Sequence, residues 1–223
     1  MLVLAIDTSS KHGSLALCHG DSATFDVLGL TLIEGGTYSA RLVPSIVDLL
    51  SRAGLTRSQI DGFVVVDGPG SFTGLRVGLA TVKGLCEILR KPLVTVSMLE
   101  ALALTYGSDG ETVITVIDAG RGEVYVAEFT ISRDRGKLGT QFILKLDEFL
   151  QQLPDLKSRV ITTFAKISGK EDAAFRLVEP LHANAIARIG LRKLLAGESV
   201  DPATLDANYI RRSDAELFSL PKR

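Results

Sequence analysis

Residues 68–78 read Gly68-Pro69-Gly70-Ser71-Phe72-Thr73-Gly74-Leu75-Arg76-Val77-Gly78. The apolar run Phe63–Val66 precedes this stretch, and a helical pattern follows it to about Leu89. A strand, a glycine-rich loop and a helix in succession can present backbone N–H groups to an anion or to a partner. The glycine spacing matches neither a Walker A loop nor the Gly-x-Gly-x-x-Gly dinucleotide motif. A tight strand-to-helix connection with close packing at Gly74 and Gly78 is an equally good interpretation.

Apolar runs and helical periodicities alternate along the first half of the chain. Pro44 lies inside the first predicted helix and indicates a delayed start or a kink, and Gly54 ends that helix. This alternation predicts an α/β lobe with a mixed sheet. The predicted strands are Leu2–Ile6, Ser14–Cys18, Ala23–Leu28, Phe63–Val66 and Pro92–Val96, and the predicted helices are Ser39–Ala53, Gly74–Leu89 and one that Ser97 caps and that runs to Tyr106.

The second half of the chain repeats the opening theme. Val113–Ile117 predicts a buried strand that leads into Asp118, a turn and the returning strand Glu123–Phe129. The opening strand leads into Asp7 in the same way, which indicates a faint internal duplication. Two unrelated hairpins would explain the pattern equally well. The remaining predictions are a charged turn over Ser132–Thr140 and a helix over Ala183–Leu195.

Composition disfavours several classes of protein. The chain has 223 residues, 46% hydrophobic and 23% charged, which suits two small lobes or one large soluble domain. The absence of Trp and an aromatic content of 6% argue against a stacking platform for nucleic-acid bases. The net charge is -1, and no basic face is evident apart from Arg211-Arg212 and Lys222-Arg223. The sequence therefore does not predict that this chain binds nucleic acid by itself.

We expect a cytoplasmic protein without membrane attachment. Cys18 and Cys86 have apolar neighbours and no Cys-x-x-Cys spacing, so they read as buried thiols in a reducing compartment. Met1–Ile6 reads as a strand rather than a targeting leader. No apolar run approaches the ~18 residues that a transmembrane helix needs.

Four groups of residues occur in an order and at separations that match one known family. The groups are Ile6-Asp7-Thr8-Ser9, the stretch at residues 68–78, Ile117-Asp118-Ala119-Gly120-Arg121-Gly122-Glu123-Val124-Tyr125, and Tyr209-Ile210-Arg211 with Asp214-Ala215-Glu216. With these groups the chain resembles, over essentially its whole length, the TsaB (YeaZ) family, bacterial proteins that partner TsaD in tRNA threonylcarbamoyladenosine synthesis. Ser71-Phe72-Thr73 favours TsaB over the related catalytic subunit TsaD.

The resemblance implies a two-lobed α/β fold of the actin, sugar-kinase and Hsp70 (ASKHA) type. The lobes would be residues 1–103 and 104–223, with the C-terminal helix able to pack back on the first. The implied role is that of a pseudo-enzyme, a scaffold or activating subunit that forms a heterodimer with TsaD. TsaD transfers threonylcarbamoyl to the adenosine beside the anticodon, in tRNAs that read codons starting with A. The ATPase TsaE joins this assembly, tRNA is reached only through it, and the chain alone can form a homodimer.

Candidate nucleotide-binding residues lie in the two turns that follow an Asp-ended strand. In the implied fold, carboxylates such as Asp7 and Asp118 orient a cation and water near phosphates, and Thr8 and Ser9 could cradle a phosphate. The favoured interpretation is that each Asp caps its own turn through side-chain-to-backbone hydrogen bonds. We therefore expect no cofactor of the chain's own, and ATP only at the interface of the complex.

The sequence offers no catalytic or metal-binding constellation. TsaD-like enzymes hold a metal with two histidines four residues apart, whereas His12, His19 and His182 have no such spacing. Ser71 does not lie in a Gly-x-Ser-x-Gly elbow, which argues against a peptidase. We predict no catalytic residue and no metal site. The alternative hypothesis is a stand-alone ASKHA-type ATPase or small-molecule kinase that uses Asp7 and Asp118.

The first two helices are the predicted partner surface. The first helix carries more apolar residues than one buried stripe needs, and the glycines of the second could let another helix approach closely. TsaB-like proteins pair through these helices, although this chain has Tyr38-Ser39 where the family commonly has His-Ser. The predicted interface residues are Leu42, Ile46, Leu49, Leu50, Gly74, Arg76, Gly78, Leu79, Val82 and Lys83.

Overall fold

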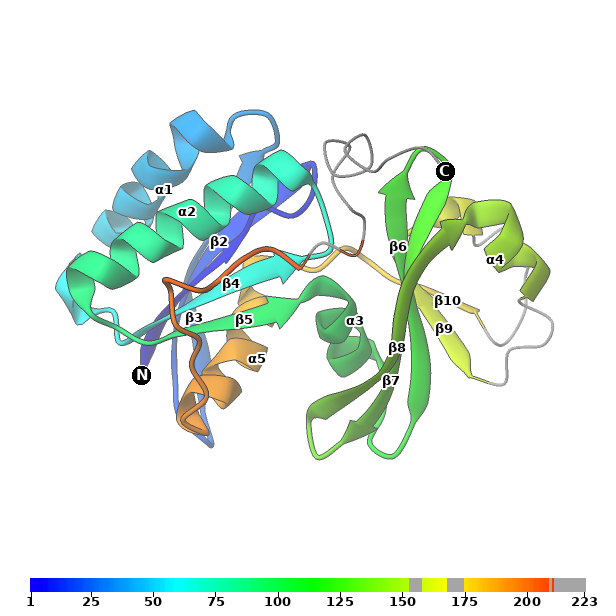
Figure 1. Ribbon diagram of the computed structural model, residues 1–223. Coiled ribbons are helices and arrows are strands. Elements are labelled where there is room, and N and C mark those ends of the chain that lie inside the picture. Colours follow the sequence, from blue (N-terminus) through cyan, green and yellow to red (C-terminus); the bar gives the residue numbers. More distant parts are fainter. Residues whose placement is uncertain (153–157, 168–174, 209, 211–223) are drawn as a thin grey trace. The chain divides into compact units, whose positions relative to one another are not determined.

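The computed structural model describes residues 1–152, 158–167, 175–208 and 210 (Figure 1). The chain divides into two compact units. Unit 1 comprises Met1–Ala101 and Pro180–Ala207, and unit 2 spans Leu102–Glu179 and resumes at Asn208. The chain leaves unit 1 after Ala101 and returns to it at Pro180. The sequence motif at residues 209–216, apart from Ile210, and the basic pairs near the C-terminus lie outside the described residues.

A five-stranded mixed sheet in the order β3-β2-β1-β4-β5 forms the centre of unit 1. The first three strands form an antiparallel meander, and β1, β4 and β5 run parallel. All six residues of β1 are buried, as expected for a central strand covered by helices on both faces. The strands are β1 Leu2–Asp7, β2 His12–Gly20, β3 Phe25–Glu34, β4 Gly62–Gly68 and β5 Leu93–Ser97.

Helices cover both faces of this sheet (Figure 1). Helices α1 (Tyr38–Arg52) and α2 (Phe72–Leu89) lie along one face, and α5 (Ala183–Leu195) lies along the other. Helix α5 packs closely because Gly190 has no side chain and its backbone lies against Val64 of β4. The other helical segments are a 3-10 turn at Arg57–Gln59 and α3 (Met98–Tyr106), which begins in unit 1 and ends in unit 2.

Unit 2 contains a second five-stranded sheet with the same topology. Its order is β10-β9-β6-β7-β8, so its first strand again lies between an antiparallel meander and two parallel strands. This repetition of strand order confirms the internal duplication. A hydrophobic cluster that includes Val116, Val126 and Phe149 forms a core of this unit. Its elements are β6 Thr112–Gly120, β7 Glu123–Ser132, β8 Arg135–Lys145, α4 Leu146–Gln152, β9 Arg159–Thr162, a 3-10 turn at Ala165–Ile167 and β10 Phe175–Leu177.

Several predicted boundaries were wrong. The third strand ends at Glu34 rather than Leu28, and helix α1 starts at Tyr38 without the delay expected from Pro44. The charged turn predicted over Ser132–Thr140 is only two residues long, Arg133 and Asp134. Both lie in the left-handed region, with φ of 48° and 63°. Strand β8 begins directly afterwards, because a hairpin needs only two such residues. Within the described residues, no helix is long and apolar enough to span a membrane.

Candidate functional site

The turn after β1 is built around a buried carboxyl group. Asp7 is 1% exposed, and its Oδ1 accepts hydrogen bonds from the Ser9 backbone N–H at 2.8 Å and the Ser9 hydroxyl at 2.7 Å. Burial raises the pKa of Asp7, and the two Ser9 hydrogen bonds and the nearby His182 oppose that rise. The carboxyl group thus caps its own turn.

Helix α2 docks on this turn through its glycines. A Cβ at Gly74 would overlap the Thr8 carbonyl oxygen, and a Cβ at Gly78 would overlap the Thr8 hydroxyl. The loop before α2 is fixed to the same turn, because the Ser71 N–H donates to the Ser9 carbonyl at 2.6 Å. The close-packing interpretation of residues 68–78 is therefore correct: Gly74 and Gly78 admit the chain's own β1–β2 turn, not a partner helix.

Helix α1 is fixed to the same turn by its first residue. The Tyr38 hydroxyl donates to the Ser10 carbonyl at 2.6 Å, and the side chain is buried. Burial, with a smaller contribution from the Asp7 charge, raises the pKa of Tyr38 to about 12. Sequence reasoning noted Tyr38 only as a departure from the family pattern; in the structure it joins α1 to the turn.

A pocket of about 500 Å³ opens beside this junction. The first turns of α1 and α2, the turn after β1 and the loop after β3 line it. Among the described residues that line it, the side-chain polar groups are hydroxyls and the Lys11 ammonium, and none is a carboxylate. Asp7, Thr8 and Ser9 do not line it. The lining residues are Ser10, Lys11, Gly35, Gly36, Tyr38, Ser39, Ser71, Thr73, Gly74 and Val77.

The second predicted carboxylate, Asp118, also serves its own turn. It is exposed, and its Oδ1 accepts a hydrogen bond from the Gly120 N–H at 2.8 Å. Gly120, Arg121 and Gly122 have φ values of 72°, 56° and 75°, so this hairpin depends on left-handed residues that the Asp118 cap orders. Asp7 and Asp118 belong to different units, and each carboxyl group caps a turn within its own unit.

A second buried polar group lies at the carboxyl ends of β4 and β5. Asp67 receives a hydrogen bond from the Thr95 side chain, yet its Oδ1 is buried without a partner, as is the Ser97 hydroxyl oxygen. The Lys193 ammonium donates to the Thr95 carbonyl at 3.2 Å and to Glu100 at 2.7 Å. Burial raises the pKa of Asp67, and Thr95 and Lys193 oppose this rise.

This geometry predicts that Asp67→Asn gains stability over the wild type as the pH rises. The folded chain keeps the Asp67 proton where the unfolded chain has released it, so stability falls as the pH rises from near 3.8 through the raised pKa. Asparagine removes that loss. Urea unfolding of both proteins across this range measures the difference in unfolding free energy. A difference that is constant with pH would contradict the assignment.

The described residues contain no group of three His, Cys, Asp or Glu side chains that could hold a metal ion. The two cysteines are free and buried, as predicted. Burial raises the pKa of Cys18 to about 12 and that of Cys86 to about 11. Neither thiol therefore forms a nucleophilic thiolate near neutral pH. Ser71 is the N-cap of α2 and accepts from the Gly74 N–H at 3.3 Å, which is a structural role.

The structure corrects the predicted partner surface residue by residue. The six apolar side chains of that prediction are 6% exposed or less and face the interior of unit 1. A partner cannot reach them while the unit keeps this fold. Arg76 is exposed and Lys83 partly so. The six buried residues are Leu42, Ile46, Leu49, Leu50, Leu79 and Val82.

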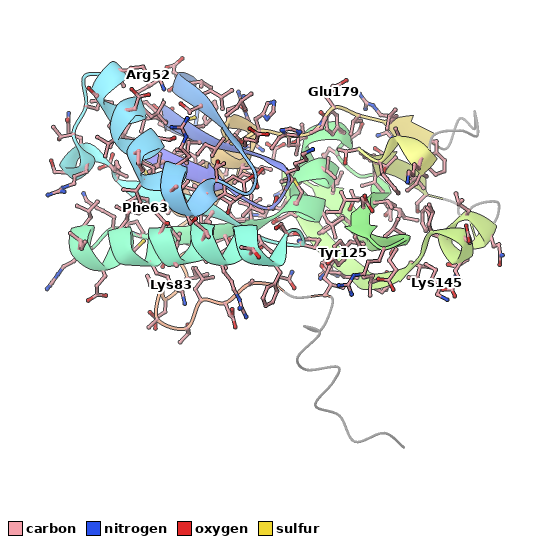
Figure 2. The ribbon with its side chains drawn as sticks, turned by 90° about the horizontal axis from the view of Figure 1, so that it is seen from above. Arg52, Phe63, Lys83, Tyr125, Lys145 and Glu179 are labelled. Atoms are coloured by element: carbon pink, nitrogen blue, oxygen red, sulfur yellow. The ribbon has the colours of Figure 1, made fainter. Side chains whose placement is uncertain are left out.

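A different set of apolar residues faces outward from the same two helices. On α1, Val43 is 56% exposed and Val47, one turn later, is 62% exposed. On α2, Ile88 is 74% exposed, and Arg76 stacks on the exposed Phe72 ring at 3.7 Å. The two helices run side by side, with Arg52 at the end of α1 and Lys83 on α2 (Figure 2). We call these five residues, Val43, Val47, Phe72, Arg76 and Ile88, the outer helix surface.

The duplicated topology, with an aspartate turn after the first strand of each sheet, defines an ASKHA-type protein, as predicted. YeaZ from Pseudomonas aeruginosa has the same fold, with a TM-score of 0.73 and 26% identity over 93% of this chain and 99% of that one.

Sequence comparisons identify the family. The TsaD family model, described as tRNA N6-adenosine threonylcarbamoyltransferase, matches residues 35–198. A protein of Haemophilus influenzae named tRNA threonylcarbamoyladenosine biosynthesis protein TsaB is 32% identical over 79% of this chain and 71% of its own length. The Escherichia coli protein of the same name is 31% identical over 73% of this chain and 70% of its own length. This chain belongs to the TsaB (YeaZ) family.

Proposed function

We propose that this chain acts in tRNA threonylcarbamoyladenosine biosynthesis as a non-catalytic subunit that binds and activates a TsaD-type transferase. The relatives named TsaB and the match to the TsaD family model support a role in this process. In this proposal TsaE and tRNA are reached only through the complex, and ATP binds where the chain meets TsaD.

The observation that carries the proposal is the contrast between the two aspartate turns and the outer helix surface. The Asp7 and Asp118 carboxyl groups both cap turns of the chain itself. The outer helix surface instead presents branched apolar side chains and an Arg76–Phe72 stack to solvent. Exposed apolar groups bordered by arginine and aromatic residues are typical of protein interfaces. Two adjacent helices that meet two others form a bundle, which is the packing we propose with TsaD.

The non-catalytic role predicts that Asp7→Asn and Asp118→Asn keep the activity of the complex. An asparagine Oδ1 can accept the same turn-capping hydrogen bonds, so both variants should fold. The measurement is threonylcarbamoyl transfer to tRNA by TsaD reconstituted with each variant, with TsaD alone as the baseline. We expect rates within about twofold of wild type, because loss of a catalytic carboxylate typically costs about 100-fold or more.

The same variants test the alternative of a stand-alone ATPase or kinase. That alternative predicts ATP turnover by the isolated chain and its loss in Asp7→Asn. If the isolated chain turns over ATP and Asp7→Asn abolishes the turnover, the non-catalytic proposal is wrong.

A further inference from the structure

Helices cover the two faces of the unit 1 sheet unequally. Helices α1 and α2 share one face, where α1 packs on the outer strand β3. On the other face α5 lies along β2: the N–H of its first residue, Ala183, donates to the Ser14 hydroxyl at 2.8 Å. Further along β2, a Cβ at Gly20 would meet the Leu191 side chain of α5. Among the described residues, no helix lies over β3 on the α5 side as α1 does on the opposite side.

The α5 side of β3 carries a row of apolar side chains. Every second residue of β2 from Ser14 to Gly20 lies on the α5 side, and residues paired across an antiparallel sheet share a face. Val27 is 45% exposed, Leu30 38% and Leu32 61%, so α5 leaves this row open. We call the β3 partners of these β2 residues, Phe25, Val27, Leu30 and Leu32, the β3 row.

A β-bulge keeps the β3 row on one face. Leu28 is the extra residue, at the point where the register of β3 against β2 shifts. In a regular strand Val27 and Leu30 would point to opposite faces, because they are three residues apart. The bulge brings them to the same face. A contiguous exposed apolar surface of this kind is typical of an interaction site.

The dimensions of the β3 row suit an α-helix. The row lies beside β2 from Ser14 to Gly20, which is ~20 Å at ~3.4 Å per residue. An α-helix of about 14 residues has this length. Packed helices lie ~8–10 Å apart and neighbouring strands ~4.8 Å apart, so a helix placed beside α5 would lie over β3. It would give this face of the sheet a second helix, as the opposite face already has.

Charges of opposite sign lie at the two ends of the β3 row. At one end the exposed Arg188 of α5 stacks on the Phe25 ring, 4.4 Å from the ring centroid. Beyond Leu32, at the other end, the next position on this face is the exposed Glu34. Neither charge has an ion-pair partner among the described residues. A complementary ligand therefore carries a carboxylate at the Arg188 end and a cation at the Glu34 end.

We propose that the β3 row binds an amphipathic α-helix of another protein, with acidic residues in its first turn and basic residues in its last. Its apolar stripe covers Val27, Leu30 and Leu32. Its acidic end meets Arg188 and its basic end meets Glu34, an arrangement that its own dipole also favours. Because α5 begins at the Leu32 end of the row, the bound helix runs antiparallel to α5.

This site does not depend on the proposed function. It lies on the face of the sheet opposite α1, so a TsaD-type partner on the outer helix surface leaves it open. The chain thereby offers separate surfaces to two partners.

Fluorescence anisotropy with a synthetic amphipathic helix of about 14 residues tests the proposal on the full chain. The labelled peptide has a leucine stripe, two glutamates in its first turn and two lysines in its last. We expect saturable binding to the wild type. Leu32→Lys should weaken it about tenfold or more, because it places a charge in the apolar contact.

A charge exchange tests the end that Arg188 marks. Arg188→Glu should weaken binding about fivefold, and a peptide with lysines in its first turn should recover that loss. The matched controls are Leu138→Lys, at an exposed leucine on β8, and Val47→Glu, on the outer helix surface. Both should bind the peptide as the wild type does. Because the assay contains no TsaD, its failure would leave the proposed function standing.

A benzophenone at the peptide N-terminus tests the direction of the helix. Cross-links should form near Phe25 and Arg188 rather than near Glu34. The proposal is overturned if the peptide shows no saturable binding, or if Leu32→Lys and Arg188→Glu both leave binding unchanged. It is also overturned if Leu32→Lys dissociates a dimer of the chain in sedimentation velocity, because a second copy then covers the row.

Discussion

We expect Gly74→Ala to lower the free energy of unfolding of unit 1 by about 3 kcal/mol, at the upper end of the cost of overpacking. The new methyl group would overlap the Thr8 carbonyl oxygen and press on the Tyr38 ring. The Thr8 carbonyl is backbone, and Asp7, Tyr38 and Ser71 hold its turn through hydrogen bonds. The Thr8 carbonyl therefore cannot move aside without disturbing the packing of both α1 and α2 on this turn.

Two further glycines of α2 serve as matched controls. A methyl group at Gly78 would meet the Thr8 hydroxyl, which can rotate, so Gly78→Ala should cost about 1 kcal/mol. A methyl group at Gly84 would lie in open space, so Gly84→Ala should gain up to about 1 kcal/mol of helix propensity. Urea unfolding followed by circular dichroism measures all three. If the three variants change stability alike, the docking of α2 on the Thr8 turn is wrong.

Long periodic elements could be predicted from the sequence. Helix α5 spans Ala183–Leu195 as predicted, because a sustained apolar period leaves little choice of structure. The duplication was visible in the two aspartate turns, and sheet topology confirmed it. Strands β9 and β10 and helix α4 were not predicted, because segments of 4, 3 and 7 residues are too short to show a period. The 11-residue strand β8 was also missed, because its charged, glycine-containing start is typical of a turn.

The surface proposed here for a partner could be predicted from the sequence only at the level of helices. An amphipathic pattern shows which residues share a face, but it does not tell whether that face meets the chain's own sheet or a partner. In α1 the stronger stripe, which includes Leu42, Ile46 and Leu49, covers the sheet. Val43 and Val47 form the weaker outward stripe, and their spacing of four residues was the available signal. Likewise, only the structure shows which neighbour the glycines at 74 and 78 admit.

The second large effect expected is the loss of TsaD binding in Val47→Glu. Val47 is exposed, so glutamate there should leave the fold intact while it places a charge on the proposed apolar interface. Burying an unpaired charge at an interface costs several kcal/mol, so we expect affinity to fall about 100-fold or more. Leu138→Glu, at an exposed apolar position on β8, is the matched control and should bind as the wild type does.

Ile46→Glu shows why the choice of residue matters. Ile46 is buried against the sheet, so glutamate there should unfold unit 1 and abolish binding for a trivial reason. Circular dichroism distinguishes this outcome from that of Val47→Glu. Only a variant that keeps the wild-type spectrum and unfolding midpoint reports on the interface.

The measurement that tests the central claim most directly is light scattering on gel-filtered mixtures of this protein with the TsaD of the same organism. The account predicts a one-to-one complex with the wild type and with Leu138→Glu, and separate species with folded Val47→Glu. A complex that survives Val47→Glu would show that the outer helix surface is not the interface. No complex with the wild type, with or without ATP and TsaE, would contradict the proposed function itself.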